Sequence, residues 1–347
     1  MNLIIDGIIE KLQDNGGCTV YFNQVLHFFQ KEKNTLSYLK YTDRNNIKIF
    51  NGKVFHPNDR FLERWLDIDI DEVNDGEDKS IFHSTHYRLP KNRDNIKVVT
   101  TVHDFTYELY CSGPARWMHS WQKNKAIKNS DLIICVSQNT ADDLMKFCPI
   151  SRDKIRVVYN GVSDSYFPLN QYKGEKNVVF IGARGRYKNF SLAVKALSNS
   201  KDYNLQIVGG GALSEEELKL LEEFLPNRYL WLGRLTDDEL NVVYNDAYCL
   251  LYPSSYEGFG IPVAEAMRAG CPVIAINTSS IPEVGGDAAI LLDEPSEQLI
   301  VEALYSLNDT PYRNELISKG IVQASKFSWE KCYENTLNVY QELIRNE

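Results

Sequence analysis

Two glutamates and a glycine-containing turn lie close together in the segment 252–276, YPSSYEGFGIPVAEAMRAGCPVIAI. Seven residues separate Glu257 from Glu265, and residues 258–260 (Gly-Phe-Gly) must form a turn between them. Pro262 marks the start of a helix, because the fixed φ and missing donor of proline are tolerated at the first helical position. Glu265 then falls in the opening turn of that helix.

This turn predicts a site for a molecule that carries both phosphate and hydroxyl groups. Glycines let a ligand approach the backbone closely, and the unpaired amides at a helix start bind anionic groups such as a diphosphate. Neighbouring carboxylates accept hydrogen bonds from hydroxyl groups. A sugar nucleotide has both features. The alternative is purely structural: Glu265 complements the helix dipole, and the glycines form an ordinary tight turn.

A second loop, FIGARGRYKNF, places Arg184, Arg186 and Lys188 just before a helix that begins near Asn189. Three cations on one loop repel one another unless they are solvated or bound to an anion. A diphosphate partner accounts for their grouping, and a solvated face is the alternative.

Histidines follow two strand-like runs of the first half. His103 and Asp104 come directly after KVVTTV, where a buried histidine with a capping aspartate is the ordinary explanation. His83 and His86, in FHSTHYRLP, also lie at a strand end and are candidates for the acceptor side of a site. Neither Cys nor Glu lies nearby at metal-ligand spacing, so a zinc site is not expected there.

Two further glycine turns precede helical patterns. Gly16 and Gly17 can receive a diphosphate or an acceptor, although an ordinary turn has the same pattern. Gly209 begins a run of three glycines after the strand YNLQIV, and Ser214 with three glutamates then opens a helix. The full GxGxxG spacing is missing, which argues against a dinucleotide oxidoreductase.

Strand-like runs alternate with amphipathic stretches in both halves, which predicts an α/β protein with two doubly wound parallel sheets. Residues just after each strand are the candidate ligand contacts, because ligands gather at the carboxyl ends of parallel strands. Strands are expected near 3–5, 81–83, 97–102, 132–136 and 155–159, and near 178–181, 205–208, 229–232, 249–252, 273–276 and 289–292.

The polar segment 163–175 is the candidate linker between the two halves. A final helix from Trp329 to about Arg345 carries an apolar stripe at helical spacing. We expect a first domain of residues 1–168, joined by the C-terminal helix 329–347, and a second domain of residues 169–328.

Length and composition are those of a folded two-domain protein. The chain has 347 residues, 43% of them hydrophobic, and a net charge of −9 without a broad basic region, which excludes nucleic acid as an expected partner. No run of eighteen apolar residues predicts a transmembrane helix, and the first residues predict a strand in place of a signal peptide. Seven scattered cysteines without a CxxC pair predict free thiols in the cytoplasm.

Together these motifs resemble the glycosyltransferase family 4 enzymes. The resemblance implies the GT-B fold, with two Rossmann-like domains that face a central cleft. It also implies donor contacts: Glu257 on sugar hydroxyls, Glu265 on the ribose, and His103 on the donor sugar. Arg184, or Arg186 in its place, and Lys188 would bind the leaving diphosphate. The remaining contacts that it implies near the donor are Gly209, Gly258, Phe259, Gly260 and Ile261.

The resemblance further implies a retaining hexosyltransferase that uses a nucleotide diphosphate sugar, with GDP-mannose as the first expectation and UDP-hexoses as the next. No metal or other cofactor is expected. The acceptor would be a saccharide or lipid-linked saccharide, in bacterial surface polysaccharide assembly such as O-antigen or capsule. The expected location is the cytoplasm. The segment 116–128 carries Trp117 and Trp121 among basic residues, which fits a peripheral membrane contact or a partly exposed helix face.

Three other functions stay open at this point. Asp67, Asp69 and Asp71 could serve a metal-dependent transferase of the single-domain type. A nucleotide-sugar epimerase of similar architecture is a second alternative. The third is a non-catalytic sugar-nucleotide-binding protein with the same fold.

Overall fold

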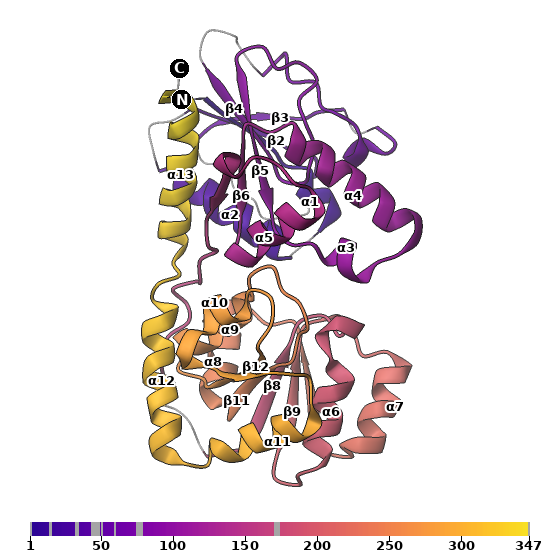
Figure 1. Cartoon of the computed structure of the whole chain (residues 1–347), viewed down its shortest axis with the longest axis vertical. Helices are drawn as coiled ribbons and strands as arrows, with labels where there is room; N and C mark the ends of the chain where they lie inside the picture. The colour runs from indigo at the N-terminus through magenta and orange to yellow at the C-terminus, as the bar shows by residue number, and fades with distance from the viewer. Residues whose placement is uncertain are drawn as a thin grey trace. The chain divides into compact units, whose positions relative to one another are not determined.

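The computed structural model describes residues 2–13, 16–31, 35–42, 49, 51–58, 60–73, 79–169 and 174–345, except the side chain of Arg186. The chain divides into two units (Figure 1). The first consists of Met1–Asn160 and Trp329–Glu347, and the second consists of Gly161–Ser328. Each unit contains one sheet, and every strand pairing in both sheets is parallel.

The first unit has a seven-stranded sheet in the order β3-β2-β1-β4-β5-β6-β7. Chain order reverses between β1 and β4, which is the arrangement of a doubly wound sheet. The strands are β1 (Asn2–Asp6), β2 (Thr35–Leu39), β3 (Lys53–Phe55), β4 (Ser80–Ser84), β5 (Ile96–Val102), β6 (Leu132–Cys135) and β7 (Ile155–Val157).

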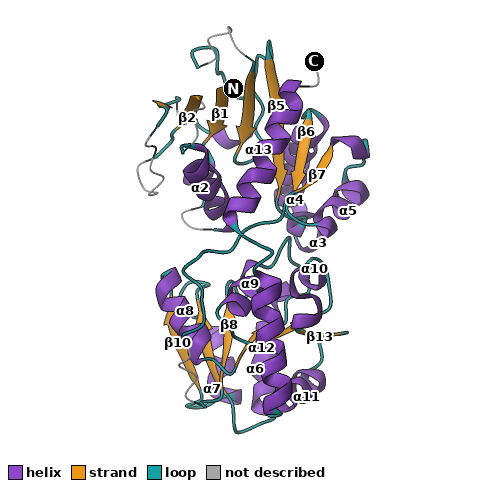
Figure 2. Ribbon diagram, turned by 90° about the vertical axis from the view of Figure 1, so that its left-hand side faces the viewer, coloured by secondary structure: helices purple, strands orange, loops and turns teal. Residues whose placement is uncertain are grey.

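Helices flank this sheet (Figure 2). They are α1 (Ile9–Leu12), α2 (Gly17–Phe29), α3 (Thr106–Tyr110), α4 (Gly113–Lys128), α5 (Gln138–Phe147) and α13 (Trp329–Arg345), with short 3-10 turns η1 (Glu63–Trp65) and η2 (Arg152–Lys154). Helices α2 and α13 share one buried cluster with the strands, in which Tyr21, Phe22 and Tyr340 pack against Ile81 and Val99.

The second unit has a six-stranded sheet in the order β10-β9-β8-β11-β12-β13. Its strands are β8 (Asn177–Ile181), β9 (Asn204–Val208), β10 (Tyr229–Gly233), β11 (Cys249–Tyr252), β12 (Val273–Ile276) and β13 (Ile290–Leu292). Its helices are α6 (Phe190–Ser198), α7 (Glu215–Phe224), α8 (Asp237–Asp246), α9 (Ile261–Arg268), α10 (Ile281–Gly285), α11 (Glu297–Ser306) and α12 (Thr310–Ala324), with 3-10 turns η3 (Arg186–Lys188) and η4 (Gly286–Ala288).

The α/β class and the parallel sheets expected from the sequence are confirmed, and each expected strand is present. Strands β2 and β3 were not expected. The first alternates apolar and polar residues over only five positions, and the second is a three-residue edge strand that is largely exposed, so neither gives a strong periodic signal.

The division between the units falls at Asn160/Gly161, earlier in the chain than the expected boundary at residue 168. The reason is local hydrogen bonding to α8. The amides of Phe167 and Leu169 donate to the side-chain oxygens of Asn241 (3.1 Å) and Asn245 (2.6 Å), so this polar segment belongs to the second unit. Residues 170–173 of the expected linker lie outside the described residues.

Among the helices that the structure describes, none has the length and apolar character needed to cross a membrane.

Candidate active site

The central feature of the second unit is an ion pair between Lys188 and Glu257. Lys188 Nζ lies 2.5 Å from Glu257 Oε1, and the two side chains are only 11% and 13% exposed. The hydroxyl of Tyr252 lies 3.4 Å from the same Nζ. Lys188 follows β8, whereas Glu257 follows β11, and these strands are neighbours in the sheet. The fold therefore brings the two motifs together at the carboxyl ends of adjacent parallel strands, as we expected.

Serines of the loop after β12 hold the backbone of Glu257 in place. The Glu257 amide donates to Ser279 Oγ (2.9 Å), and Ser280 Oγ donates to the Glu257 carbonyl (3.0 Å). Ser279 has a positive φ of 51°, which is uncommon outside glycine and asparagine. The role of these serines as supports of Glu257 could not be inferred from the sequence, because the two loops lie 22 residues apart in the chain.

The turn before α9 requires glycine at position 260. Gly260 is the N-cap of the helix with φ 92°, and a Cβ there would lie 2.7 Å from the Ile281 side chain. Helix α9 begins at Ile261, with Pro262 in its first turn. Phe259 is buried with its ring against Phe327. Pro262 has no amide hydrogen, and the Val263 amide donates to the Gly260 carbonyl at 3.0 Å, so Ile261 carries the first amide of α9 without an acceptor in the helix.

Glu265 is not in the opening turn of α9, contrary to the expectation. It is the fifth residue of the helix, and it does not cap the helix start. Its carboxylate instead accepts a hydrogen bond from the Tyr244 hydroxyl of α8 at 3.3 Å. Burial, and secondarily the charge of Asp237, raises the pKa of Glu265 to about 8. Glu265 therefore holds its proton more tightly than an exposed glutamate does.

Arg184 forms its contacts within the second unit. Its Nε donates to Glu217 Oε1 (2.9 Å), and its side chain is 3% exposed. Its terminal nitrogens donate to the carbonyl oxygens of residues 209–212 at 2.9–3.2 Å. Gly209, Gly210 and Gly211 all have positive φ, so their backbone is unusual and Arg184 fixes it. The diphosphate contact stays a prediction, and the side chain of Arg186 lies outside the described residues.

His103 lies in the first unit, directly after β5. Its ring packs edge-on against Tyr21 at 5.2 Å, and within the described residues its Nε2 is a buried atom without a hydrogen-bond partner. Burial lowers its pKa to about 4, so the ring is neutral at neutral pH. His103 can therefore exchange a hydrogen bond with a ligand hydroxyl without bringing a charge.

The prediction that His83 lines an acceptor site is wrong. This residue is fully buried in β4, with Nδ1 2.7 Å from the Tyr340 hydroxyl and Nε2 2.9 Å from Thr101 Oγ1. Both ring nitrogens are therefore used to join β4, β5 and α13. His86 lies beyond the end of β4 and lines a pocket with His103.

Gly16 is the N-cap of α2, and Gly17 is its first residue, at the start of the same unit. A Cβ at position 16 would meet only the far end of the Gln13 side chain, which can move away, and position 17 has open space around it. Packing therefore does not require glycine at either position, and a ligand contact by either glycine stays a prediction.

The acidic residues considered for a metal do not gather. Asp67 pairs with Lys125 at 2.7 Å, and Asp69 lies 3.7 Å from Lys91 Nζ. Across the described ranges, no group of three or more His, Cys, Asp or Glu side chains is placed to hold a metal ion.

Each unit has a Rossmann-like sheet. In the second unit, a lysine, two glutamates and a helix with a glycine N-cap lie near the ends of adjacent strands. Together these features define a class of enzyme that acts on nucleotide-activated sugars. Comparison with known proteins agrees with this class. Residues 163–323 match the family model for glycosyl transferases group 1, and residues 40–166 match that for Glycosyltransferase Family 4. The chain belongs to this glycosyltransferase family, and it is a glycosyltransferase.

Two relatives carry more specific names. O-antigen chain mannosyltransferase B of Escherichia coli is 29% identical over 285 residues, which cover 75% of this chain and 74% of that protein. O-antigen chain mannosyltransferase RfbU of Salmonella typhimurium is 28% identical over 238 residues, covering 67% of this chain and 66% of that protein.

Solved structures share the fold. Sucrose-phosphate synthase from Thermosynechococcus elongatus superposes with a TM-score of 0.79 at 16% identity and covers 100% of both chains. The Anabaena protein HepE, in complex with UDP and glucose, gives 0.73 at 15% identity and covers 98% of this chain and 99% of that one. The GT-B fold is confirmed, which contradicts the single-domain alternative. Membership of the family likewise favours a transferase over an epimerase or a non-catalytic protein.

Proposed function

We propose that this chain is a retaining hexosyltransferase that moves mannose from GDP-mannose to a saccharide or lipid-linked saccharide acceptor. UDP-hexoses are the next donors to consider. The names of the two relatives support mannose and a place in O-antigen assembly, and capsule assembly is the related alternative. The observation that carries the donor site is the buried Lys188–Glu257 pair beside the start of α9.

In this proposal the donor diphosphate lies at Lys188 and the Ile261 amide at the start of α9. When the bond between the anomeric carbon and the diphosphate oxygen breaks, its electron pair stays on that oxygen. Oriented donors that face this developing charge stabilise it without reorganising. The ammonium of Lys188 is held by Glu257 and Tyr252 before the donor arrives, so it is already positioned.

The sugar contacts are assigned to Glu257 and His103. A diphosphate near Lys188 takes over part of the interaction with the ammonium, and the Glu257 carboxylate is then able to accept hydrogen bonds from sugar hydroxyls. Glu265 accepts from the ribose hydroxyls. The acceptor oxygen bonds to the anomeric carbon on the face that the diphosphate leaves, which retains the configuration, and its proton passes to the leaving diphosphate.

No metal takes part in the proposed reaction, because lysine and helix amides supply the positive charge at the diphosphate. The proposed location is the cytoplasm, at the inner face of the membrane where a lipid-linked acceptor resides. The exposed Trp117 and Trp121 of α4 support a peripheral contact with that surface, as their side chains are 70% and 50% exposed.

The test combines a donor screen with matched variants. GDP-mannose and UDP-hexoses are offered with saccharide and lipid-linked saccharide acceptors in the presence of excess chelator, and the anomeric configuration of the product is read by NMR. Lys188→Met and Glu257→Gln are each expected to lower kcat about 100- to 1,000-fold, the usual effect of losing one charge-stabilising group. Lys201→Met, on an exposed lysine of the same unit, serves as the control.

Three results would contradict the proposal. An inverted product would rule out retention, and loss of activity in chelator would rule out a metal-free reaction. Unchanged kcat in both site variants would remove the assigned donor site.

A further inference from the structure

A pocket of about 200 Å³ lies within the first unit, at the carboxyl ends of β1, β4 and β5. Three histidines line it, His86, His103 and His119, together with Arg64 and Asp104. Its volume is below that of ordinary sites for whole small ligands, which begin near 300 Å³, and it exceeds that of a few water molecules at about 30 Å³ each. The size fits one substituent or one ring of a larger ligand.

The histidines do not bring positive charge to this pocket. Arg64 Nη2 lies 3.0 Å from His86 Nε2, and arginine can only donate, so His86 accepts there and is neutral. His119 stacks face to face on Tyr107 with 3.9 Å between ring centroids. Burial lowers the pKa values of His103 and His119 to about 4 and that of His86 well below its usual value.

Arg64 is thus the permanent cation among the residues that line the pocket, and the described part of the chain gives it no counter-charge. Among the described residues it forms no ion pair, and its Nε is a buried atom without a hydrogen-bond partner. Asp104 also lines the pocket, but its Oδ1 accepts the Thr106 amide at 2.9 Å and no ion pair joins it to Arg64. The guanidinium lies over the Trp65 ring at 4.4 Å and donates to His86, but neither contact neutralises its charge, which an anionic ligand would do.

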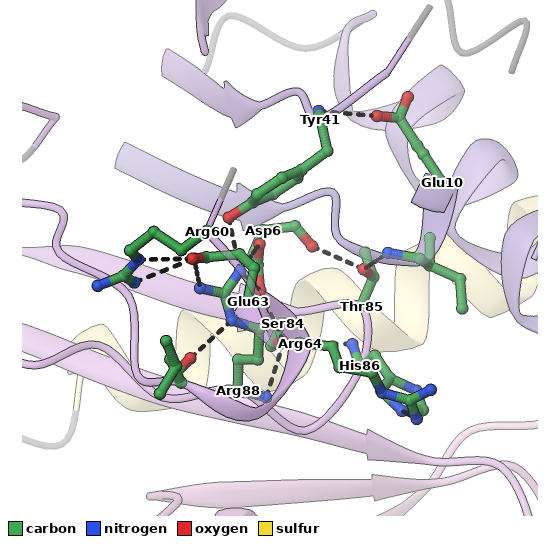
Figure 3. A network of polar contacts seen from close by, with 12 residues as sticks. Asp6, Glu10, Tyr41, Arg60, Glu63, Arg64, Ser84, Thr85, His86 and Arg88 are labelled. Atoms are coloured by element: carbon green, nitrogen blue, oxygen red, sulfur yellow. Dashed lines mark hydrogen bonds and ion pairs between the residues drawn. The ribbon is translucent and has the colours of Figure 1, made fainter. Parts of the chain in front are cut away.

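The fold holds Arg64 at this place through a buried network (Figure 3). Arg88, fully buried, donates to Glu63 Oε1 at 2.5 Å and to the Leu66 carbonyl at 2.9 Å, on either side of Arg64 in the chain. The same guanidinium lies 3.2 Å from Asp6 at the end of β1.

A further hydrogen bond comes from Gln122 of α4, whose amide donates to the Arg64 carbonyl. Several buried hydrogen bonds therefore fix the position of Arg64, whose charge has no ion-pair partner among the described residues. Two buried ring nitrogens of the same pocket, His103 Nε2 and His119 Nδ1, also have no hydrogen-bond partner there.

We propose that this pocket binds an anionic substituent of the acceptor, a phosphate or a carboxylate, and that Arg64 selects it. This inference rests on the proposed function, because it concerns the acceptor of that reaction. The planar fork of arginine matches both anions with paired hydrogen bonds, and His86, His119 and Tyr107 contact the attached sugar.

The test measures binding of simple probes to the full chain without any donor. Glucose 6-phosphate carries a phosphate, glucuronate carries a carboxylate, methyl glucoside is the neutral match, and inorganic phosphate tests the anion alone. Calorimetry is expected to give at least tenfold tighter binding for one of the two anionic sugars than for methyl glucoside. Tighter binding of glucose 6-phosphate would identify phosphate as the preferred anion, and tighter binding of glucuronate would identify carboxylate.

Variants of Arg64 test its role in selection. Arg64→Gln is expected to weaken binding of the anionic sugar at least tenfold and to leave methyl glucoside unchanged, whereas Arg64→Lys is expected to retain part of the preference. Arg152→Gln removes an exposed arginine of the same unit as the control. Because Arg64→Gln could impair folding, the ring ¹⁵N signals of His86 and His119 in the unaltered chain provide a second reading, and they should shift with the anionic sugar only.

Equal binding of neutral and anionic sugars, or full retention of the preference in Arg64→Gln, would overturn the inference. Binding of inorganic phosphate without either anionic sugar would also overturn it, since it would show an adventitious ion only. Failure of these assays with sugar transfer intact would leave the proposed function standing, because the assays use no donor.

Discussion

At the scale of single residues, burial decides how the candidate donor side chains behave. Glu257 and Glu265 lie in one motif, yet the first pairs with a lysine at 2.5 Å and the second contacts the hydroxyl groups of Tyr244 and Tyr166. The consequence is a pKa of about 8 for Glu265, against 4.5 for an exposed glutamate. The two carboxyl groups therefore lie in different surroundings, although the sequence presents them as a matched pair.

This raised pKa predicts the pH dependence of stability. The folded chain holds the Glu265 proton more tightly than the unfolded chain, so the free energy of unfolding falls as pH rises from about 4.5 to about 8. The penalty is absent below that window and complete above it. The glutamine of Glu265→Gln cannot ionise. As pH rises through this window, the variant's free energy of unfolding relative to the unaltered chain should therefore increase by up to a few kcal/mol, at about 1.4 kcal/mol per pH unit.

Urea unfolding of the second unit at pH 5 and pH 8 measures this difference. Glu216→Gln, on an exposed glutamate of α7, is the control and should change stability equally at both pH values. Parallel pH curves for Glu265→Gln and the unaltered chain would show that Glu265 is ionised in the folded state.

At the scale of elements, one guanidinium joins three parts of the second unit. Arg184 follows β8, Glu217 lies in the first turn of α7, and the carbonyls of 209–212 connect β9 to α7. Glu217 also completes the capping box of Ser214. Burial alone would raise the pKa of Glu217, but the Ser214 amide and Arg184 outweigh it and hold the pKa below its usual value. The loop geometry thus depends on both side chains.

Arg184→Lys keeps the charge and loses the fork of donors. We expect it to lower the free energy of unfolding of the second unit by about 1–3 kcal/mol, the usual effect of losing hydrogen bonds to a charged group. Glu217→Gln keeps a side chain that can complete the capping box and removes only the ion pair, so it should destabilise in the same direction by less. Calorimetry measures both changes.

The opposite pattern would favour a direct diphosphate contact. If Arg184→Lys weakened donor binding and left stability unchanged, Arg184 would act on the ligand and its hydrogen bonds to the loop would be secondary.

At the scale of the whole molecule, the C-terminal helix α13 belongs to the first unit, whose other residues end at Asn160. Helix α13 contributes Trp329, Cys332, Tyr333, Val339 and Tyr340 to the core cluster of the first unit. The Tyr340 hydroxyl meets His83, 257 residues away in sequence. Burial of such side chains is worth about 1.5–3 kcal/mol each, so the first unit depends on the C-terminal segment for its stability.

A chain that ends at Ser328 should lose the cooperative unfolding transition of the first unit and keep that of the second. Differential scanning calorimetry and limited proteolysis measure the two units separately. Tyr340→Phe is the mild companion variant: it removes the hydrogen bond to His83, leaves the ring packed, and should cost about 1–3 kcal/mol. A first unit that still unfolds cooperatively without residues 329–347 would contradict this account.

Much of the architecture could be predicted, because strands buried in parallel sheets leave strong apolar runs. The expected strand segments, the helix starts after Asn189, Ser214 and Gly260, and the extent of α13 all agree with the structure. Strands β2 and β3 were missed, because one is short and the other exposed. The site was predicted only in part. Lys188 and Glu257 do lie together after neighbouring strands, whereas His83 is a core residue and not an acceptor contact.

The sequence by itself determined the class of fold, the strand-end motifs and the resemblance to a glycosyltransferase family, because these depend on local pattern and spacing. Only the tertiary structure decided the partners of each polar side chain: serines under Glu257, loop carbonyls around Arg184, and an unpaired guanidinium at Arg64. Hydrogen bonding and burial depend on contacts between segments that are far apart in the chain, and local residue patterns do not show which segments make contact.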